Sequence, residues 1–159
     1  MKHLRKLAYL LALVIFGFDQ LSKYLVITKL SIGRSEIIIP GYLYFTSHRN
    51  QGAAWGILQG KMWFFYIITF IVVGVIIYYI QKHVQQSLLL TISLGLVLGG
   101  TIGNFYDRFF RHAVVDFIHT PLFDFPIFNI ADMSLTFGVG CLILYIFLDE
   151  KNRKESAIG

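Results

Sequence analysis

Four long apolar stretches constrain the fold of this chain more than any other feature of its sequence. They lie at about residues 7–27, 62–80, 88–106 and 130–148. A helix that crosses the hydrocarbon core of a bilayer needs roughly 20 mostly apolar residues, with a range of about 17–25. The second and third stretches contain no Asp, Glu, Lys or Arg. The sequence therefore predicts an all-α membrane protein with four transmembrane helices.

The composition supports the same interpretation. Of the 159 residues, 56% are hydrophobic and only 14% are charged, whereas a soluble domain has about 25% charged residues. The formal charge of +5 suits a protein beside anionic lipid headgroups. Lys and Arg are scattered at the ends of the apolar stretches instead of forming a stripe, which disfavours nucleic acid as a partner. We expect one integral membrane domain over residues 1–159.

An even number of spans places both termini on the same side of the membrane. The count of Lys and Arg hardly differs between the two sides, but basic residues cluster at both termini, which favours a cytoplasmic position for them. Loops 28–61 and 107–129 would then share the extracytoplasmic face. In the first loop, residues 37–39 and 42–46 are β-branched and aromatic runs separated by Pro40-Gly41. This pattern predicts two strands and a turn, and so a small extracytoplasmic β-rich subdomain between helices 1 and 2.

Small and charged residues inside the spans indicate how the helices pack. Gly95, Gly99 and Gly103 recur at four-residue spacing in the third stretch, and small residues at this spacing let helices approach closely in lipid. Asp19 and Lys23 are four residues apart in the first stretch, with the acid first. That order favours an ion pair on one helix, so we expect a structural pair.

Two further acidic residues lie at span edges, where ionised groups are costly. Asp116 follows the third span among apolar neighbours, and Asp132 begins the fourth. Because Asp116 follows the third span and Asp132 begins the fourth, both residues lie at the same membrane face. Two carboxylates held together in an apolar site share a proton, because they cannot easily both ionise. One Asp can then act as a base on water while the other donates a proton to a scissile carbonyl.

Spacing alone leaves a plainer explanation of these two residues open. Asp132 could simply cap the fourth helix, where a carboxylate is favoured. Asp116 could pair with Arg108 or Arg111.

Other chemistry finds little support in the sequence. There is no HExxH motif, and His112 and His119 flank Asp116 without helical metal spacing. Cys141 is the single cysteine and lies in an apolar run, so it forms no disulfide within the chain. We expect no metal and no cofactor.

Five segments, in order along the chain, carry a resemblance to a known family. They are Asp-Gln-Leu-Ser-Lys at 19–23, Arg-Asn-Gln-Gly-Ala-Ala-Trp-Gly at 49–56, Gly-Asn-Phe-Tyr-Asp-Arg at 103–108, Val-Val-Asp-Phe at 114–117 and Phe-Asn-Ile-Ala-Asp at 128–132. Together they resemble the lipoprotein signal peptidase family, also called signal peptidase II or prolipoprotein signal peptidase. The family usually has Phe where Trp55 stands. It also commonly has Gly shortly before the Val-x-Asp-Phe segment, where this chain has Arg111-His112-Ala113.

The resemblance implies an aspartic endopeptidase of the bacterial cytoplasmic membrane, with its active site near the extracytoplasmic face. Its substrate would be a prolipoprotein whose cysteine carries diacylglycerol, cut just before that cysteine. Asp116 and Asp132 would be the catalytic dyad, and Asp19 with Lys23 would hold the architecture. The residues that position substrate or support the site would be Asn50, Gly52, Asn104, Arg108 and Asn129. We expect a monomer that contacts membrane lipids and its substrate, with Tyr42–Phe45 and Trp55 as a lid over the groove.

Two rival functions remain at this stage. A small four-span transporter would use its acidic residues to carry protons or bind cations. Such a protein would need an acidic residue deep in a span. Asp19 is the acid set well inside an apolar run, and Lys23 would neutralise it. A non-enzymatic assembly factor could use the glycine face of the third span. It would not need Asp116 or Asp132.

Overall fold

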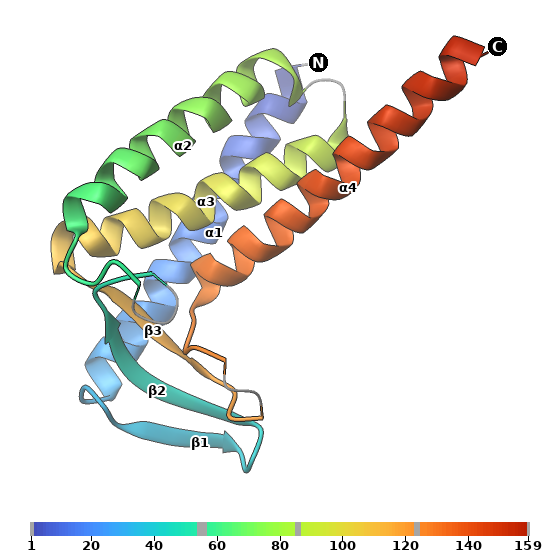
Figure 1. Ribbon diagram of the computed structural model, residues 1–159. Helices are drawn as coiled ribbons and strands as arrows, with labels where there is room; N and C mark the ends of the chain where they lie inside the picture. The colour runs from blue at the N-terminus through green and yellow to red at the C-terminus, as the bar shows by residue number, and fades with distance from the viewer. Residues whose placement is uncertain (1, 54–56, 85–86, 123–124, 159) are drawn as a thin grey trace.

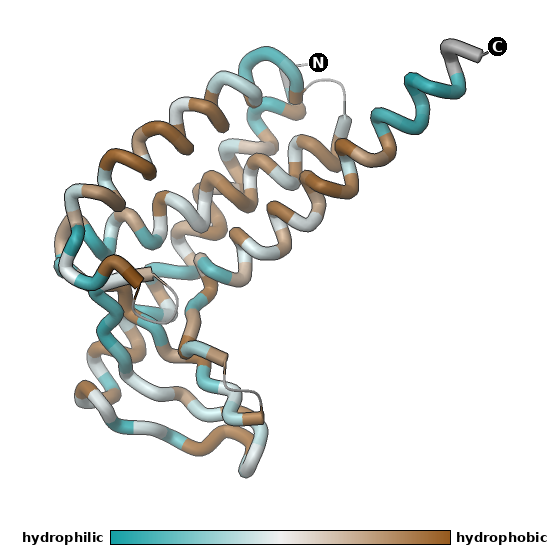
Figure 2. The backbone as a smooth tube through the Cα atoms, viewed as in Figure 1, coloured by the Kyte–Doolittle hydropathy of each residue, from teal (hydrophilic) through white to brown (hydrophobic). Residues whose placement is uncertain are grey.

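Four long helices form the body of the protein in a computed structural model that describes residues 2–53, 57–84, 87–122 and 125–158. The helices are α1 (Lys2–Lys29), α2 (Met62–Lys82), α3 (Leu88–Arg111) and α4 (Ile130–Ile158). Each contains one of the apolar stretches predicted from the sequence, and each is long and apolar enough to cross a membrane. Figure 2 shows hydrophobic residues along the middle of the helices, while the projecting end of α4 is mostly hydrophilic.

Helix α3 lies at the centre of the bundle and packs against the other three helices (Figure 1). Its glycines allow this. A Cβ atom on Gly99 would lie 2.8 Å from the Ala12 carbonyl oxygen of α1, and one on Gly100 would lie 2.5 Å from the Ala131 carbonyl oxygen of α4. Such distances are too short for a side chain, so the helix backbones touch directly, as small residues permit in lipid. The predicted packing role of the glycine face is therefore correct.

A three-stranded antiparallel sheet lies at one end of the bundle. Strands β1 (Ser35–Ile39) and β2 (Leu43–Asn50) are the two predicted from the first loop, joined by a turn in which Gly41 has a φ of 78°. The third strand, β3 (Val114–His119), was not predicted and comes from the segment between α3 and α4. It pairs with β2, so the β-rich part draws on both loops and not only on the one between helices 1 and 2.

Strand β3 is fixed against the bundle by alternate side chains. Val115 and Phe117 are buried in a cluster with Val26 of α1. Because side chains alternate across a strand, Asp116 points to the opposite face. Ile118 also pairs with Phe128, just before α4. The strand thereby brings Asp116 to the mouth of α4.

Both termini lie at the end of the bundle away from the sheet, as an even number of spans requires (Figure 1). One expectation about the loops needs correction. Helix α3 continues to Arg111, so Asp107 is helical and not part of a loop. In the proposed lid, Phe45 packs edge-on against Phe117 with ring centroids 5.6 Å apart, which makes it part of the sheet's packing. Trp55 falls outside the described residues.

Candidate active site

Asp116 lies in the middle of β3, with only 2% of its surface exposed. Its carboxylate accepts two side-chain hydrogen bonds: Asn50 Nδ2 donates to Oδ2 at 3.0 Å, and Asn129 Nδ2 donates to Oδ1 at 2.7 Å. Asn50 ends β2, which pairs with β3, so the sheet brings this amide to the carboxylate. The alternative pairing with Arg111 is not what the structure contains, because that guanidinium pairs with Asp107.

Asp132 lies in the first turn of α4 and serves two purposes. Its Oδ2 accepts the backbone N–H of Asn129 at 3.2 Å, while Asn129 Oδ1 accepts the backbone N–H of Asp132 at 3.0 Å. This reciprocal arrangement is a capping box, so the capping interpretation holds for one carboxylate oxygen. The other oxygen, Oδ1, accepts a hydrogen bond from Asn104 Nδ2 of α3 at 2.7 Å.

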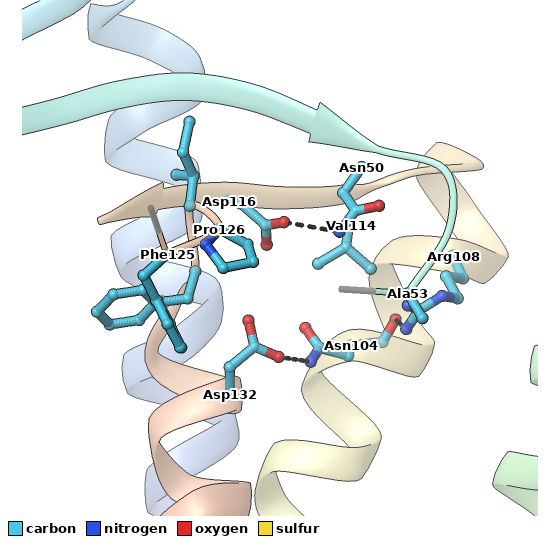
Figure 3. A pocket seen from close by; sticks show the side chains of 11 residues that line it. Asn50, Ala53, Asn104, Arg108, Val114, Asp116, Phe125, Pro126 and Asp132 are labelled. Carbon is cyan, nitrogen blue, oxygen red and sulfur yellow. Dashed lines mark hydrogen bonds between the residues drawn. The ribbon is translucent and has the colours of Figure 1, made fainter. Parts of the chain in front are cut away.

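The two aspartates share one cavity of about 180 Å³. Figure 3 shows their carboxyl groups facing one another across it, one from the sheet and one from α4. The cavity walls also include Asn50, Asn104, Arg108, Phe125, Pro126 and Phe128. Burial, and then the nearby Asp132 carboxylate, raise the pKa of Asp116 to about 7. A buried pair with one raised pKa retains a proton near neutral pH.

Arg108 connects α3 to the loop that follows β2. Its Nη2 donates to the Gly52 carbonyl at 2.9 Å, and its guanidinium lies 4.3 Å from the centre of the Phe65 ring. The backbone N–H of Gly52 in turn donates to Asn50 Oδ1 at 2.9 Å. Arg108 and Asn50, which both line the cavity, are therefore linked through the backbone of Gly52.

Asp19 and Lys23 lie in a buried cluster beside the cavity. Lys23 Nζ is 2.8 Å from Asp19 Oδ2, and both side chains are fully buried. The same nitrogen is 2.9 Å from Asp107 Oδ2 and donates to Asn104 Oδ1 at 3.1 Å. The structure thus brings the predicted pair and Asn104 together and adds Asp107, which sequence reasoning did not select. The signal was available, because Asp107 lies within the 103–108 motif.

Ligands for a metal are not grouped in the part of the chain that the structure describes. No cluster of three or more His, Cys, Asp or Glu side chains occurs among those residues. The donors around the two aspartates are amides and one guanidinium, groups that bind carboxylates or carbonyl oxygens.

Comparisons with known proteins show which family the chain resembles over its length. A family model described as Signal peptidase (SPase) II matches residues 11–148. Lipoprotein signal peptidases of Shouchella clausii and Bacillus pumilus are 57% and 53% identical over 150 residues, covering 94% and 93% of this chain and 99% and 97% of theirs. A solved structure described as a bacterial membrane enzyme, determined by the in meso method at 2.3 Å resolution, superposes with a TM-score of 0.88. It is 47% identical, over 93% of this chain and 92% of that chain.

Proposed function

We propose that this chain, which belongs to the signal peptidase II family, removes the signal peptide from bacterial prolipoproteins whose cysteine carries diacylglycerol. It is an aspartic peptidase and a multi-pass bacterial membrane protein. The proposed cut lies directly before the lipidated cysteine. The observation that carries the proposal is the pair Asp116 and Asp132, facing each other across one cavity at the end of a membrane-spanning bundle.

The proposed reaction needs one proton on the pair. The ionised carboxylate takes a proton from a water molecule, and the oxygen of that water attacks the scissile carbonyl carbon. The protonated carboxyl gives its proton to the carbonyl oxygen, which yields a neutral gem-diol. When the C–N bond breaks, the pair gives its proton to the departing cysteine nitrogen and takes one from a hydroxyl of the gem-diol, which becomes the new carboxyl group. The pair again holds one proton. The raised pKa of Asp116 supports this shared state.

The surrounding amides support the pair in the same scheme. Asn129 and Asn50 hold Asp116, and Asn104 holds Asp132. Arg108 lines the cavity beside the place where the substrate backbone would lie, and its bond to the Gly52 carbonyl supports it there. The substrate's lipid and signal peptide arrive within the bilayer, so a site at the membrane surface suits them. We place this end of the bundle on the extracytoplasmic side and both termini in the cytoplasm, with the protein acting as a monomer.

Cleavage of a diacylglyceryl-modified prolipoprotein by the purified protein tests the proposal. Asp116→Asn and Asp132→Asn each remove an acid while keeping size, and we expect each folded variant to lose nearly all activity. Asp149→Asn is the matched control, because Asp149 lies on the distal part of α4 and pairs with Arg153. Full activity of either dyad variant would show that the catalytic assignment is wrong. If the wild-type protein does not cleave this substrate under conditions in which a homologue does, the proposed substrate is wrong.

A further inference from the structure

The ammonium group of Lys23 is fully committed to three buried partners. An ammonium has three N–H donors, and Nζ contacts Asp19 Oδ2 at 2.8 Å, Asp107 Oδ2 at 2.9 Å and Asn104 Oδ1 at 3.1 Å. Lys23, Asp19 and Asp107 have no exposed surface. None of these three charged groups can therefore touch a substrate.

Each of the two carboxylates in this cluster also accepts a backbone hydrogen bond next to a catalytic aspartate. Asp19 Oδ1 accepts the N–H of Ala131, the residue directly before Asp132, at 3.0 Å. Asp107 Oδ2 accepts the N–H of Val115, the residue directly before Asp116, at 3.1 Å. One ammonium thus joins two carboxylates, and each carboxylate holds the backbone beside one member of the pair.

We infer that Asp107 is a positioning residue that sets where Asp116 stands relative to Asp132, acting through the Val115 N–H and through Lys23. The inference rests on the proposed function, since it takes these two aspartates as the catalytic pair. Asp116 belongs to the sheet and Asp132 to the bundle. No single element therefore holds both carboxyl groups. A common anchor on α1 and α3 adds to the direct links that Phe128 and Asn129 make between β3 and α4.

The charges in the cluster explain why the anchor is rigid. Asp107 also pairs with Arg111, one turn along α3, and Arg111 donates to Gln20 Oε1 at 2.9 Å. Asp19, Asp107, Lys23 and Arg111 together carry no net charge. Three of these four groups are fully buried and Arg111 is partly exposed. A paired cluster of this kind is costly to distort, because a displaced buried charge would lose its partner in a low-dielectric setting.

The test compares Asp107→Asn with Asp107→Leu, each combined with Arg111→Gln so that the cluster keeps zero net charge. Asparagine retains an oxygen that can accept the Val115 N–H, whereas leucine has a similar volume and no acceptor. We expect the leucine variant to lose about 100-fold in kcat, the order expected for a misplacement of about 1 Å, with KM within about twofold. The asparagine variant should recover most of kcat. Leu94→Ala, a buried core change on α3, is the control for lost stability alone.

Equal kcat in the two double variants, or a loss in kcat that merely follows thermal stability as in Leu94→Ala, overturns the inference. If the leucine variant does not fold, Asp107→Ser takes its place, because its hydroxyl is too short to reach the Val115 N–H. If serine also fails to fold while asparagine folds, Asp107 is required for folding and the positioning role is wrong. An active Asp116→Asn enzyme would instead refute the proposed catalytic pair, and a wild-type protein that does not cleave would refute the proposed function, whatever the variants at 107 do.

Discussion

The side-chain amide of Asn129 lies 2.7 Å from Asp116, Nδ2 to Oδ1, so the residue that caps α4 also holds the carboxyl group on β3. The cap itself uses the other amide atom, Oδ1, which accepts the Asp132 N–H. One fully buried asparagine therefore fixes the orientation of both aspartates, and its two functions can be separated by substitution.

Asn129→Ser should keep the helix cap and lose the bond to Asp116, whereas Asn129→Ala should lose both. A hydrogen bond to a charged group contributes about 1.5–3 kcal/mol, so we expect kcat/KM to fall roughly 10- to 100-fold in both variants. Only the alanine variant should lose a further ~1 kcal/mol of stability, the usual value of an N-cap. Prolipoprotein cleavage and thermal unfolding in detergent measure the two effects. A serine variant as active as the wild type would contradict the role given to the amide.

The raised pKa of Asp116 predicts how stability depends on pH. Burial and then Asp132 raise this pKa from 3.8 to about 7. The folded protein therefore keeps a proton that the unfolded chain releases, and stability falls as pH rises from about 4 to about 7. Asp116→Asn removes this titration. Its melting temperature should rise relative to wild type across that window and stay at a constant offset above pH 8. A difference in melting temperature between Asp116→Asn and wild type that stays constant over the whole pH range would argue against a raised pKa. Asp149→Asn serves as the control.

The helices could be predicted because their signal is local, whereas the pairing of β3 with β2 could not. A long apolar run specifies a membrane helix by itself. The six residues Val114–His119 contain a buried Asp116 and form a strand only by pairing with β2. The partners are distant in sequence, as in Asn50 opposite Val114. Nothing within the segment itself reveals that pairing.

The same reasoning explains which parts of the site were missed. Asp116 and Asp132 stand out because acids are rare in apolar surroundings. Asp107 lies just beyond the third apolar stretch, so the apolar pattern predicts a loop there. The structure continues α3 to Arg111 and turns Asp107 inward to Lys23. Helix ends depend on tertiary contacts that the apolar pattern does not contain.

Gly100→Ala tests the close contact between α3 and α4. The added Cβ would lie 2.5 Å from the Ala131 carbonyl oxygen, and backbone cannot yield as a flexible side chain can. We expect a loss of about 1–3 kcal/mol in stability, the usual effect of overpacking. Cleavage should also fall, because Ala131 precedes Asp132. Gly74→Ala on α2 is the control, since its Cβ would meet nothing within 4 Å. Equal melting temperatures for the two variants would mean that the helices do not pack this closely.

His112 connects α3 to β3 in a left-handed conformation, with φ at 56° and ψ at 17°. Glycine adopts such angles without strain, whereas a β-branched residue pays about 1–3 kcal/mol. His112→Gly should therefore be at least as stable as wild type, and His112→Val should unfold at a lower temperature. The side chain is exposed, so the difference would report on the backbone. Equal stability of the glycine and valine variants would contradict the assigned conformation. Because this residue sets the angle at which β3 leaves α3, the valine variant should also cleave more slowly at temperatures where it remains folded.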